Sequence, residues 1–328
     1  MSVIASQRMR RRRARWLLRA IQKRRDLRPV RNRTGAIRAD DLLAISTVRN
    51  ELAGLPAFLD HYRRIGIGQF LFVDNGSTDG TGEFLADQPD VSLWHADGRY
   101  GAAAFGVDWT NWLLNRYGHG HWCLSVDADE FLVYPFHDTR PLRALTDWLD
   151  ARRTRSFGAM LLDLYPSGPI GATPSTRHPF EIPVWFDGGN YTVERNDPVG
   201  NLWIQGGVRA RCLFADQPEE APALNKVPLV RWRRGYVHMS STHMLLPRGL
   251  NRTYDAAGGE RTTGILLHAK FLGPAREDGV RSEHYRQGSE HRRHAAAFGS
   301  ELRCAASERY DGWRCLVGLG LMSKGNWA

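Results

Sequence analysis

Two aspartates spaced two residues apart, Asp127 and Asp129, point most clearly to chemistry in this 328-residue sequence. They follow the apolar segment 122–126, which is typical of a buried strand, and in an extended chain both side chains can point to one side. Two carboxylates held so close are unfavourable unless a positive charge lies between them. Because Mg²⁺ and Mn²⁺ prefer carboxylate oxygen and often bridge to phosphate, the pair predicts a divalent metal site. The alternative is a pair of turn or helix-capping aspartates.

A second polar run lies about fifty residues earlier, directly after the apolar segment 70–73. It reads DNGSTDGT, and this composition requires a tight turn with a helix start behind it. Asp74 either caps that turn or accepts hydrogen bonds from a base or ribose. The backbone of Asn75, Gly76 and Ser77 offers donors that could approach a nucleotide.

Strand-like and helix-like segments alternate between these motifs. We expect strands at 42–48, 70–73, 91–94 and 122–126, and helices from about 55 to 65 and from about 102 to 117. This alternation predicts an α/β fold with a mostly parallel sheet and helices on both faces. Ligands of such sheets bind beyond the carboxyl ends of the strands, so Asn50, Asp74 and the Asp127/Asp129 pair should converge on one crevice.

The motifs also resemble a known family. FVDNGSTDGT (72–81) looks like the VDDGSTDGT signature of family-2 glycosyltransferases, and RNE (49–51) resembles the residues after their first strand. LSVDADEFLVYP (124–135) is similar to the D-x-D-E-F form of a bacterial subgroup. The resemblance covers residues 40–135 well and continues more weakly to 272. It implies a GT-A (Rossmann-like) fold with a C-terminal acceptor-side region, a nucleotide-diphosphate sugar donor, Mn or Mg, and usually inversion.

Residue by residue, the resemblance implies that Asp74 contacts the base or ribose and that Asn50 and Glu51 border the nucleotide. It implies that Asp127 and Asp129 hold the ribose and the metal–diphosphate. The sequence departs from the family at Asn75, where a second acid is usual. It also lacks a clear E-D or Q-x-x-R-W motif downstream, which leaves the catalytic base open.

Candidates for the remaining roles lie farther along the chain. A base would remove the proton of the acceptor hydroxyl, and a third ligand would complete the metal site. A lone histidine in an apolar run is more often a core residue, and lone cations are often surface charges. The candidates are Glu130, Asp187 and Glu194 as base, His243 in preference to His268 as metal ligand, and Arg209, Arg211 and Lys226 as diphosphate or acceptor-anion contacts.

The N-terminal segment carries the excess positive charge. Residues 1–38 contain fourteen Lys and Arg and one acid, whereas the remaining 290 residues carry a net charge of −3. Met9, Trp16, Leu17, Ala20 and Ile21 recur at helical spacing among arginines. Such a basic amphipathic helix fits an anionic membrane surface, through residues 8–25. A disordered arm attracted to any polyanion fits equally well. Residues 29–35 resemble a linker.

We therefore expect a basic tail (1–38) and a glycosyltransferase domain (39–328), with a nucleotide-sugar-binding half (39–150) and an acceptor-side half (151–328). The four cysteines lack zinc spacing and are expected to be reduced, with a Cys304–Cys315 disulfide as the alternative. No apolar run approaches the roughly 18–20 residues of a membrane span, and no secretion signal is evident. The expected location is cytoplasmic, peripheral on the inner face of the cell membrane.

The leading hypothesis is a metal-dependent, inverting glycosyltransferase that acts on a glycan or lipid-linked acceptor. One alternative is a GT-A-like scaffold that binds a nucleotide without catalysis. Another is a polyanion- or nucleic-acid-binding protein that acts through its basic tail, although the acidic body and the lack of a nucleic-acid module argue against specific nucleic-acid binding. A nucleotidyltransferase should show a Gly-rich loop after the first strand, and residues 48–51 do not form one.

Overall fold

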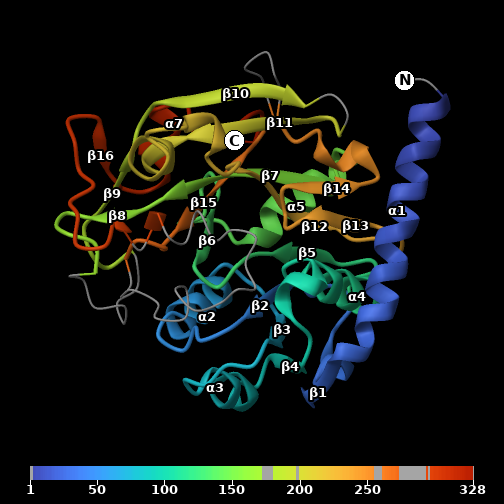
Figure 1. Ribbon diagram of the computed structural model, residues 1–328. Coiled ribbons are helices and arrows are strands. Elements are labelled where there is room, and N and C mark those ends of the chain that lie inside the picture. The colour runs from blue at the N-terminus through green and yellow to red at the C-terminus, as the bar shows by residue number, and fades with distance from the viewer. Residues whose placement is uncertain are drawn as a thin grey trace.

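A nine-stranded sheet runs through the computed structural model, with helices on both of its faces (Figure 1). The structure describes residues 3–171, 180–196, 199–254, 261–272, 293–294 and 296–327. The order of the strands across the sheet is β1-β4-β3-β2-β5-β12-β7-β15-β6. In chain order they are β1 (Leu27–Arg31), β2 (Leu43–Val48), β3 (Gln69–Asp74), β4 (Val91–Ala96), β5 (Trp122–Ser125), β6 (Glu130–Val133), β7 (Ser156–Asp163), β12 (Asn225–Arg231) and β15 (Gly264–His268).

Most strands of this sheet run in one direction. β2, β3, β4 and β5 are mutually parallel. β12 is antiparallel to both β5 and β7, and β15 is parallel to β7, so β7 and β15 share the direction of β5. Only β1, β12 and β6 are reversed. The chain winds from β2 outward through β3 to β4 and then returns to the other side of β2 as β5, which confirms the expected mostly parallel α/β sheet and makes the β2–β5 boundary a topological switch point.

The two faces of the sheet have separate cores. On one face pack α2 (Leu55–Arg64), α3 (Thr81–Asp87) and α5 (Leu142–Ala151), whose buried side chains include Phe58, Leu85 and Leu145. On the other face packs α4 (Val107–Tyr117), with Trp109 and Leu113 against alternate residues of β2 and β3. This alternation follows from the pleat, which sends successive side chains to opposite faces.

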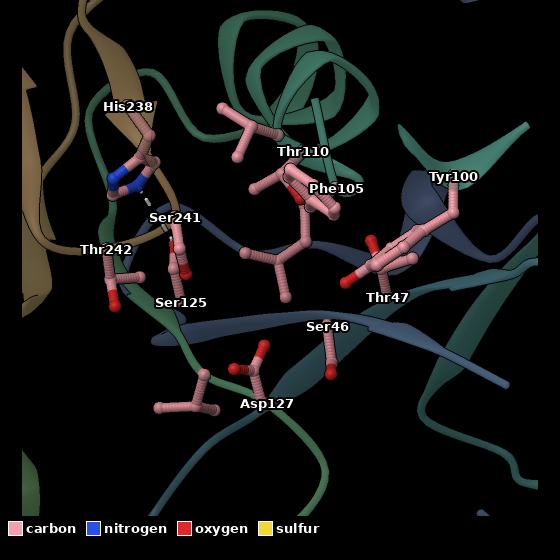
Figure 2. Close-up of a pocket in the computed structure, with 13 residues that line it drawn as sticks. Ser46, Thr47, Tyr100, Phe105, Thr110, Ser125, Asp127, His238, Ser241 and Thr242 are labelled. Carbon is pink, nitrogen blue, oxygen red and sulfur yellow. Dashed lines mark hydrogen bonds between the residues drawn. The ribbon is translucent and has the colours of Figure 1, made fainter. Parts of the chain in front are cut away.

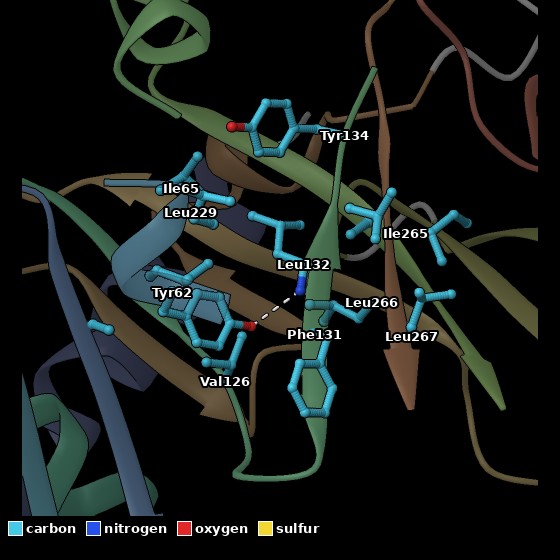
Figure 3. Close-up of a cluster of buried hydrophobic side chains, with 14 of the residues drawn as sticks. Tyr62, Ile65, Val126, Phe131, Leu132, Tyr134, Leu229, Ile265, Leu266 and Leu267 are labelled. Carbon is cyan, nitrogen blue, oxygen red and sulfur yellow. Dashed lines mark hydrogen bonds between the residues drawn. The ribbon is translucent and has the colours of Figure 1, made fainter. Parts of the chain in front are cut away.

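Helix α2 also fixes the strand that follows the Asp127–Asp129 motif. The Tyr62 hydroxyl donates to the carbonyl of Glu130 at 2.8 Å and accepts from the amide of Leu132 at 3.1 Å (Figure 3). Around it pack Phe131 of β6 and Leu266 of β15, both buried. The C-terminal end of the loop between β5 and β6 is thus held in place by hydrogen bonds to Tyr62 of α2.

The expected helix at 102–117 begins later, at Val107. Residues 100–103 form a 3₁₀ turn, and Ala104, Phe105 and Gly106 then all adopt left-handed backbone angles, with φ of 51°, 59° and 79°. A Cβ on Gly106 would also lie 2.9 Å from the Thr47 hydroxyl, so this position needs glycine. The helix therefore cannot start before this kink.

The N-terminal segment is part of the folded body, contrary to the linker expected at 29–35. Helix α1 (Val3–Lys23) packs along α4 and β13 (Val237–Ser240), and β1 pairs antiparallel with β4 at the edge of the sheet (Figure 1). Arg19 forms a 2.8 Å ion pair with the buried Asp108 of α4. The predicted apolar stripe is therefore turned toward the protein at Met9, Trp16 and Leu17, whereas its last member, Ile21, is exposed.

The C-terminal part adds small elements around the shared sheet, to which both predicted halves of the chain contribute strands. These elements are a ribbon of β10 (Tyr191–Asn196) and β11 (Asn201–Gly206), a sheet of β8 (Tyr165–Pro166), β9 (Val184–Asp187) and β16 (Ser307–Arg309), the pair of β13 with β14 (Met244–Leu246), and α7 (Trp313–Gly318). All four cysteines are free, so the Cys304–Cys315 disulfide is not formed. Among the described residues, every helix is too short or too polar to cross a membrane.

Candidate functional site

A pocket lies at the switch point of the sheet, between the carboxyl ends of β2 and β5. Its floor comes from Ser46 and Thr47 of β2 and from the end of β5, where Asp127 follows (Figure 2). Its remaining walls are the segment before α4, the start of α4 and the end of β13, which contribute Tyr100, Phe105, Thr110, His238, Ser241 and Thr242. Polar groups from four separate parts of the chain therefore meet where doubly wound sheets bind their ligands.

The pocket contains polar atoms that the protein does not satisfy. The hydroxyls of Ser46, Thr47 and Thr242 and the Nδ1 of His238 are all buried and have no hydrogen-bond partner among the described residues. A buried polar group without a partner costs about 1–3 kcal/mol. Four such atoms around one pocket are the arrangement expected of a surface that completes its hydrogen bonds on a ligand or on water.

Backbone strain is also present at the rim of the pocket. Phe105 and Ser241 both line the pocket and both adopt left-handed backbone angles, with φ of 59° and 44°. For residues with a side chain this conformation costs about 1–3 kcal/mol, and it clusters at ligand clamps and active sites. The strain therefore supports a functional role for the pocket independently of its unsatisfied atoms.

His238 is held as a neutral ring. Its Nε2 lies 3.3 Å from the hydroxyl of Ser125, and its backbone is fixed on both sides by the amide side chain of Asn111. Burial, together with the positive charge of Lys226, lowers the pKa of His238 to about 3. Near neutral pH the ring therefore carries one proton, and Nδ1 is free to act as a hydrogen-bond donor or acceptor according to the tautomer.

The loop from Asp127 to Glu130 rests on a buried ion pair. Lys226 of β12 donates to Glu130 at 2.8 Å, and the other Glu130 oxygen accepts from the backbone amide of Asp127 at 3.2 Å. Both side chains are almost completely buried, with 4% and 1% of their surface exposed. Glu130 therefore supports the loop and cannot reach an acceptor hydroxyl in this arrangement. Lys226 is the other member of this ion pair, so it could contact a ligand only if the pair rearranges.

Asp127 projects from this loop at the mouth of the pocket. Its side chain is 56% exposed, and one oxygen lies 3.8 Å from the ammonium of Lys226. Desolvation and the nearby charges of Glu130 and Asp129 raise the pKa of Asp127 to about 6, against the opposing effect of Lys226. Because much of the Asp127 side chain is exposed to water, loss of hydration contributes less to the raised pKa than burial alone would suggest. The two neighbouring carboxylates also raise this pKa.

Asp129 belongs to a different chain of contacts. It lies 3.2 Å from Nε2 of His268, whose Nδ1 lies 2.6 Å from Asp163 at the end of β7. Arg209, in a short π-helix (Arg209–Leu213), pairs with both oxygens of Asp163 at 2.7 and 2.8 Å. Burial alone would lower the pKa of His268, but Asp129 and Asp163 raise it to about 9. Arg209 is thus committed to a buried network behind the site and is not free for a diphosphate.

The donor set around Asp129 suits a cation that arrives with a diphosphate. A Mg²⁺ or Mn²⁺ of this kind takes one or two protein ligands and completes its shell with phosphate oxygens and water. Asp129 would supply an oxygen, and the Nε2 of His268 would supply a nitrogen once the cation displaces the proton that the raised pKa keeps on the ring near neutral pH. The carboxylate of Asp163 behind Nδ1 is the usual partner of a metal-binding histidine. Among the described residues no group of three or more His, Cys, Asp or Glu is arranged to hold a metal, so the protein by itself offers a partial site.

The polar run after β3 is hydrogen-bonded to the loop after β2. Asp74 accepts from the amide of Ser77 at 3.0 Å and from its hydroxyl, and the carboxamide oxygen of Asn50 accepts from the amide of Thr78 at 2.8 Å. Asn75 donates to the carbonyls of Ala96 and Gly98, both at 2.9 Å. These groups shape two turns.

Neither loop reaches into the pocket. The predicted nucleotide contacts Asn50, Glu51, Asp74, Asn75, Gly76 and Ser77 are brought together in space, but none of them lines it.

The other predicted residues are spread more widely. His243 donates from Nδ1 to the carbonyl of Asn225 at 2.7 Å, whereas His268, the alternative metal ligand, is the histidine in contact with Asp129. Asp187 is buried in a bidentate pair with Arg211, at 2.9 Å for both bonds. Glu194 is exposed on β10.

Several contributors were not named by the sequence analysis, among them Thr47, His238, Thr242 and Asp163. His238 and Thr242 lie in a stretch of mixed polarity in the C-terminal half, and Asp163 ends a strand whose one other polar residue is Ser156. A charged residue at the end of such a strand was the one signal that could have indicated Asp163. Nothing in local spacing connects residues 238–242 with β2, because the contact is made by tertiary packing.

Neither a scan against models of known protein families nor a search of curated proteins found a match to this chain.

Proposed function

We propose that this protein is a metal-dependent, inverting glycosyltransferase of the GT-A fold that transfers a sugar from a nucleotide-diphosphate donor to a glycan or lipid-linked acceptor. One observation carries the proposal. A pocket with unsatisfied polar atoms lies at the switch point of a doubly wound sheet, and Asp127 and Asp129 follow it directly on the same loop. The resemblance of residues 40–135 to family-2 glycosyltransferases points to the same chemistry.

The site residues support distinct roles in this reaction. Asp127 is the exposed carboxylate at the mouth of the pocket and suits the ribose hydroxyls. Asp129 and His268 would hold the cation, which would offset the negative charge that develops on the departing diphosphate. Asp163 and Arg209 fix the ring of His268 in its present orientation.

Calorimetric titration tests this function. UDP, GDP and their sugars are titrated into the full chain with and without MnCl₂, beside the Asp129→Asn variant. We expect binding that requires Mn²⁺ and that falls at least about 100-fold in the variant, because a ligand to the cation is lost. Absence of nucleotide binding to the wild type would overturn the proposal.

A second candidate, a nucleotide-binding scaffold without catalysis, is favoured by the placement of two base candidates. Glu130 and Asp187 are both buried in pairs with cations, so neither carboxylate is free to accept a proton. Release of UDP or GDP from the bound nucleotide sugar separates the two functions. Turnover in the presence of Mn²⁺ and an acceptor extract supports the transferase, and tight binding without release supports the scaffold.

We also propose that helix α1 brings the protein to an anionic membrane surface. Residues 3–25 contain no acid, and Arg8, Arg10, Arg11 and Arg15 of the helix are exposed, as is Arg25 of the 3₁₀ turn that follows it. Leu18 and Ile21 stand among these arginines with 55% and 47% of their surface exposed. Arginines that surround apolar side chains suit the interface of an anionic bilayer better than a purely polar polyanion.

Flotation with vesicles tests the membrane proposal. The protein should bind phosphatidylcholine vesicles that contain phosphatidylglycerol and should not bind pure phosphatidylcholine. Replacing Arg10, Arg11 and Arg15 with Gln should weaken binding about 100-fold, at about 1 kcal/mol per charge. The matched control replaces Arg153, Arg233 and Arg234, which are exposed elsewhere. Equal loss in both variants, or binding of RNA but not of vesicles, would contradict the proposal.

A further inference from the structure

One wall of the pocket is a strained segment of backbone. Residues 100–106 form a 3₁₀ turn followed by three left-handed residues, and Tyr100 and Phe105 of this segment line the pocket (Figure 2). Consecutive left-handed residues are unfavourable by themselves, so such a backbone persists only where its surroundings fix it. The contacts that fix this segment therefore also determine the shape of the pocket wall.

The N-terminal helix α1 supplies one of these contacts through Arg19. The guanidinium of Arg19 donates to both carboxylate oxygens of Asp108, at 3.3 Å and 2.8 Å, and to the carbonyl of Ala102 at 3.3 Å. Ala102 lies just before the left-handed residues, and Asp108 lies just after them in the first turn of α4. One side chain of α1 therefore bridges the two ends of the strained segment.

The pairing of Arg19 with Asp108 follows from the charges of the two helices. Residues 3–25 contain no acid, so Arg19 can pair only with a carboxylate outside its own helix. The Asp108 side chain is completely buried, whereas that of Arg19 is 44% exposed. Burial raises the pKa of Asp108, and Arg19 and Lys23 oppose this by favouring the charged form. A buried carboxylate is unfavourable without a counter-charge, so Asp108 holds α1 against the pocket wall.

The 3₁₀ turn after α1 holds the start of the same segment. Asp26 of this turn accepts a hydrogen bond from the indole Nε1 of Trp109 at 3.2 Å, and its backbone carbonyl accepts from the amide of Asp97 at 3.2 Å. Gly98 passes so close to the Asp26 carboxylate that a Cβ at this position would clash with it. Residues 97–109 are thus fixed from outside by the N-terminal segment.

We propose that Arg19 is a positioning residue of the nucleotide site, and that through it the docking of α1 and the binding of nucleotide stabilise each other. The inference rests on the proposed function and adds a regulatory link to it. A nucleotide that needs the present pocket wall binds less tightly when α1 is released, and by linkage a bound nucleotide holds α1 in place. The helix proposed to meet the membrane is then also the helix that shapes the site.

Variants of two arginines test this role in the full chain. Arg19→Gln removes the charge, and Arg19→Lys keeps the charge but cannot form the bidentate pair. Arg63→Gln is the matched control, because Arg63 also lies on a helix, is 37% exposed and pairs bidentately with a carboxylate, that of Asp90. Arg63 belongs to α2, none of whose described residues lines the pocket.

The readouts are the affinity for UDP and GDP in MnCl₂ and amide hydrogen exchange along the chain. Arg19→Gln should weaken the preferred nucleotide about 10-fold, since hydrogen bonds to a charged group are lost from the wall. Arg19→Lys should recover part of this loss, and Arg63→Gln should bind as the wild type does. Exchange in Arg19→Gln should be faster in α1 and in residues 97–109, and bound nucleotide should slow exchange in both segments of the wild type.

Three results would overturn the inference while the proposed function stands. They are wild-type affinity in Arg19→Gln, an equal loss of affinity in Arg63→Gln, and unchanged exchange in α1 when the wild type binds nucleotide. The exchange measurement on the wild type needs no variant, so it decides the question even if Arg19→Gln does not fold. Absence of nucleotide binding to the wild type would overturn both the inference and the proposed function.

Discussion

The loop after β3 and the pocket between β2 and β5 are both rich in polar side chains, but they use those side chains in opposite ways. In the loop, Oδ1 of Asp74 accepts two hydrogen bonds from Ser77 of the same turn, and the carboxamide of Asn75 donates to the carbonyls of Ala96 and Gly98. In the pocket, the hydroxyl groups of Ser46, Thr47 and Thr242 have no hydrogen-bond partner within the part of the chain that the structure describes. The loop carries the more recognisable motif, and the pocket carries the unused hydrogen-bonding capacity.

This difference shows that polar residues at the end of a strand can play two structural roles. Turn residues satisfy their own backbone and hold a shape, whereas ligand-binding residues are held by other elements and keep atoms free. Lys226, Asp163 and Arg209 are such supporting residues, since they hold Asp127, Asp129 and His268 from behind. The predictions below test this division.

The largest effect is expected at the support of the Asp127 loop. Lys226→Met leaves Glu130 buried without its partner and should lower the free energy of unfolding by about 3–5 kcal/mol. Adding Glu130→Gln should restore much of this loss, because no charge then remains buried. Urea denaturation measures both variants, and equal stability of the single variant and the wild type would contradict the buried pair.

Asn75→Ala should separate stability from binding. It leaves the carbonyls of Ala96 and Gly98 without their donor and should cost about 2–3 kcal/mol of unfolding free energy. Nucleotide affinity at low temperature should stay at the wild-type value, since Asn75 shapes a turn outside the pocket. A marked loss of affinity in a folded variant would show that the β3 loop contacts the ligand.

Asp163→Asn should weaken Mn²⁺-dependent nucleotide binding about 10–100-fold, because it removes the carboxylate that orients His268. Asp187→Asn is the matched control, since Asp187 is also buried and also pairs bidentately with an arginine, Arg211. Calorimetry in MnCl₂ compares the two variants. Equal losses in both would mean that Asp163 acts on stability alone.

His238 gives a smaller effect that depends on pH. Its folded-state pKa of about 3 lies below that of an unfolded histidine, so the unfolded chain binds more protons below pH 6.5 and stability falls as pH falls. At pH 5.5 this contribution is about 1.4 kcal/mol. Urea denaturation at pH 7.5 and 5.5 should show a loss smaller by that amount in His238→Gln than in the wild type. The same loss in both would mean that the ring titrates normally.

The sequence predicted the N-terminal strands and helices well because their apolar periodicity is strong. Segments 42–48, 70–73, 91–94 and 122–126 correspond to β2, β3, β4 and β5. The late start of α4 was missed because left-handed angles at Ala104 and Phe105 leave no compositional mark. The docking of α1 was missed because a helix with an apolar stripe packs equally well against a protein or a membrane, and only the tertiary structure decides between them.

The site was predictable only in part for the same reason. Asp127 and Asp129 stand out because two carboxylates follow an apolar strand, and the structure brings His268 to Asp129. The pocket was not predictable, since residues 238–242 reach β2 through tertiary contacts, the packing of β13 on α4 and the hydrogen bond from the Val227 amide of β12 to the Thr242 carbonyl. Spacing in the sequence indicates which polar residues follow a strand. Tertiary packing decides which of these residues retain polar atoms without a hydrogen-bond partner inside the protein.

A crystal structure of the full chain with UDP or GDP, whichever calorimetry selects, and MnCl₂ tests the central claim most directly. We predict that the nucleotide lies beyond the carboxyl ends of β2 and β5, with its ribose at Asp127. Anomalous scattering from Mn²⁺ should appear beside Asp129 and His268. A nucleotide bound elsewhere on the protein, or Mn²⁺ bound away from Asp129, would contradict this account.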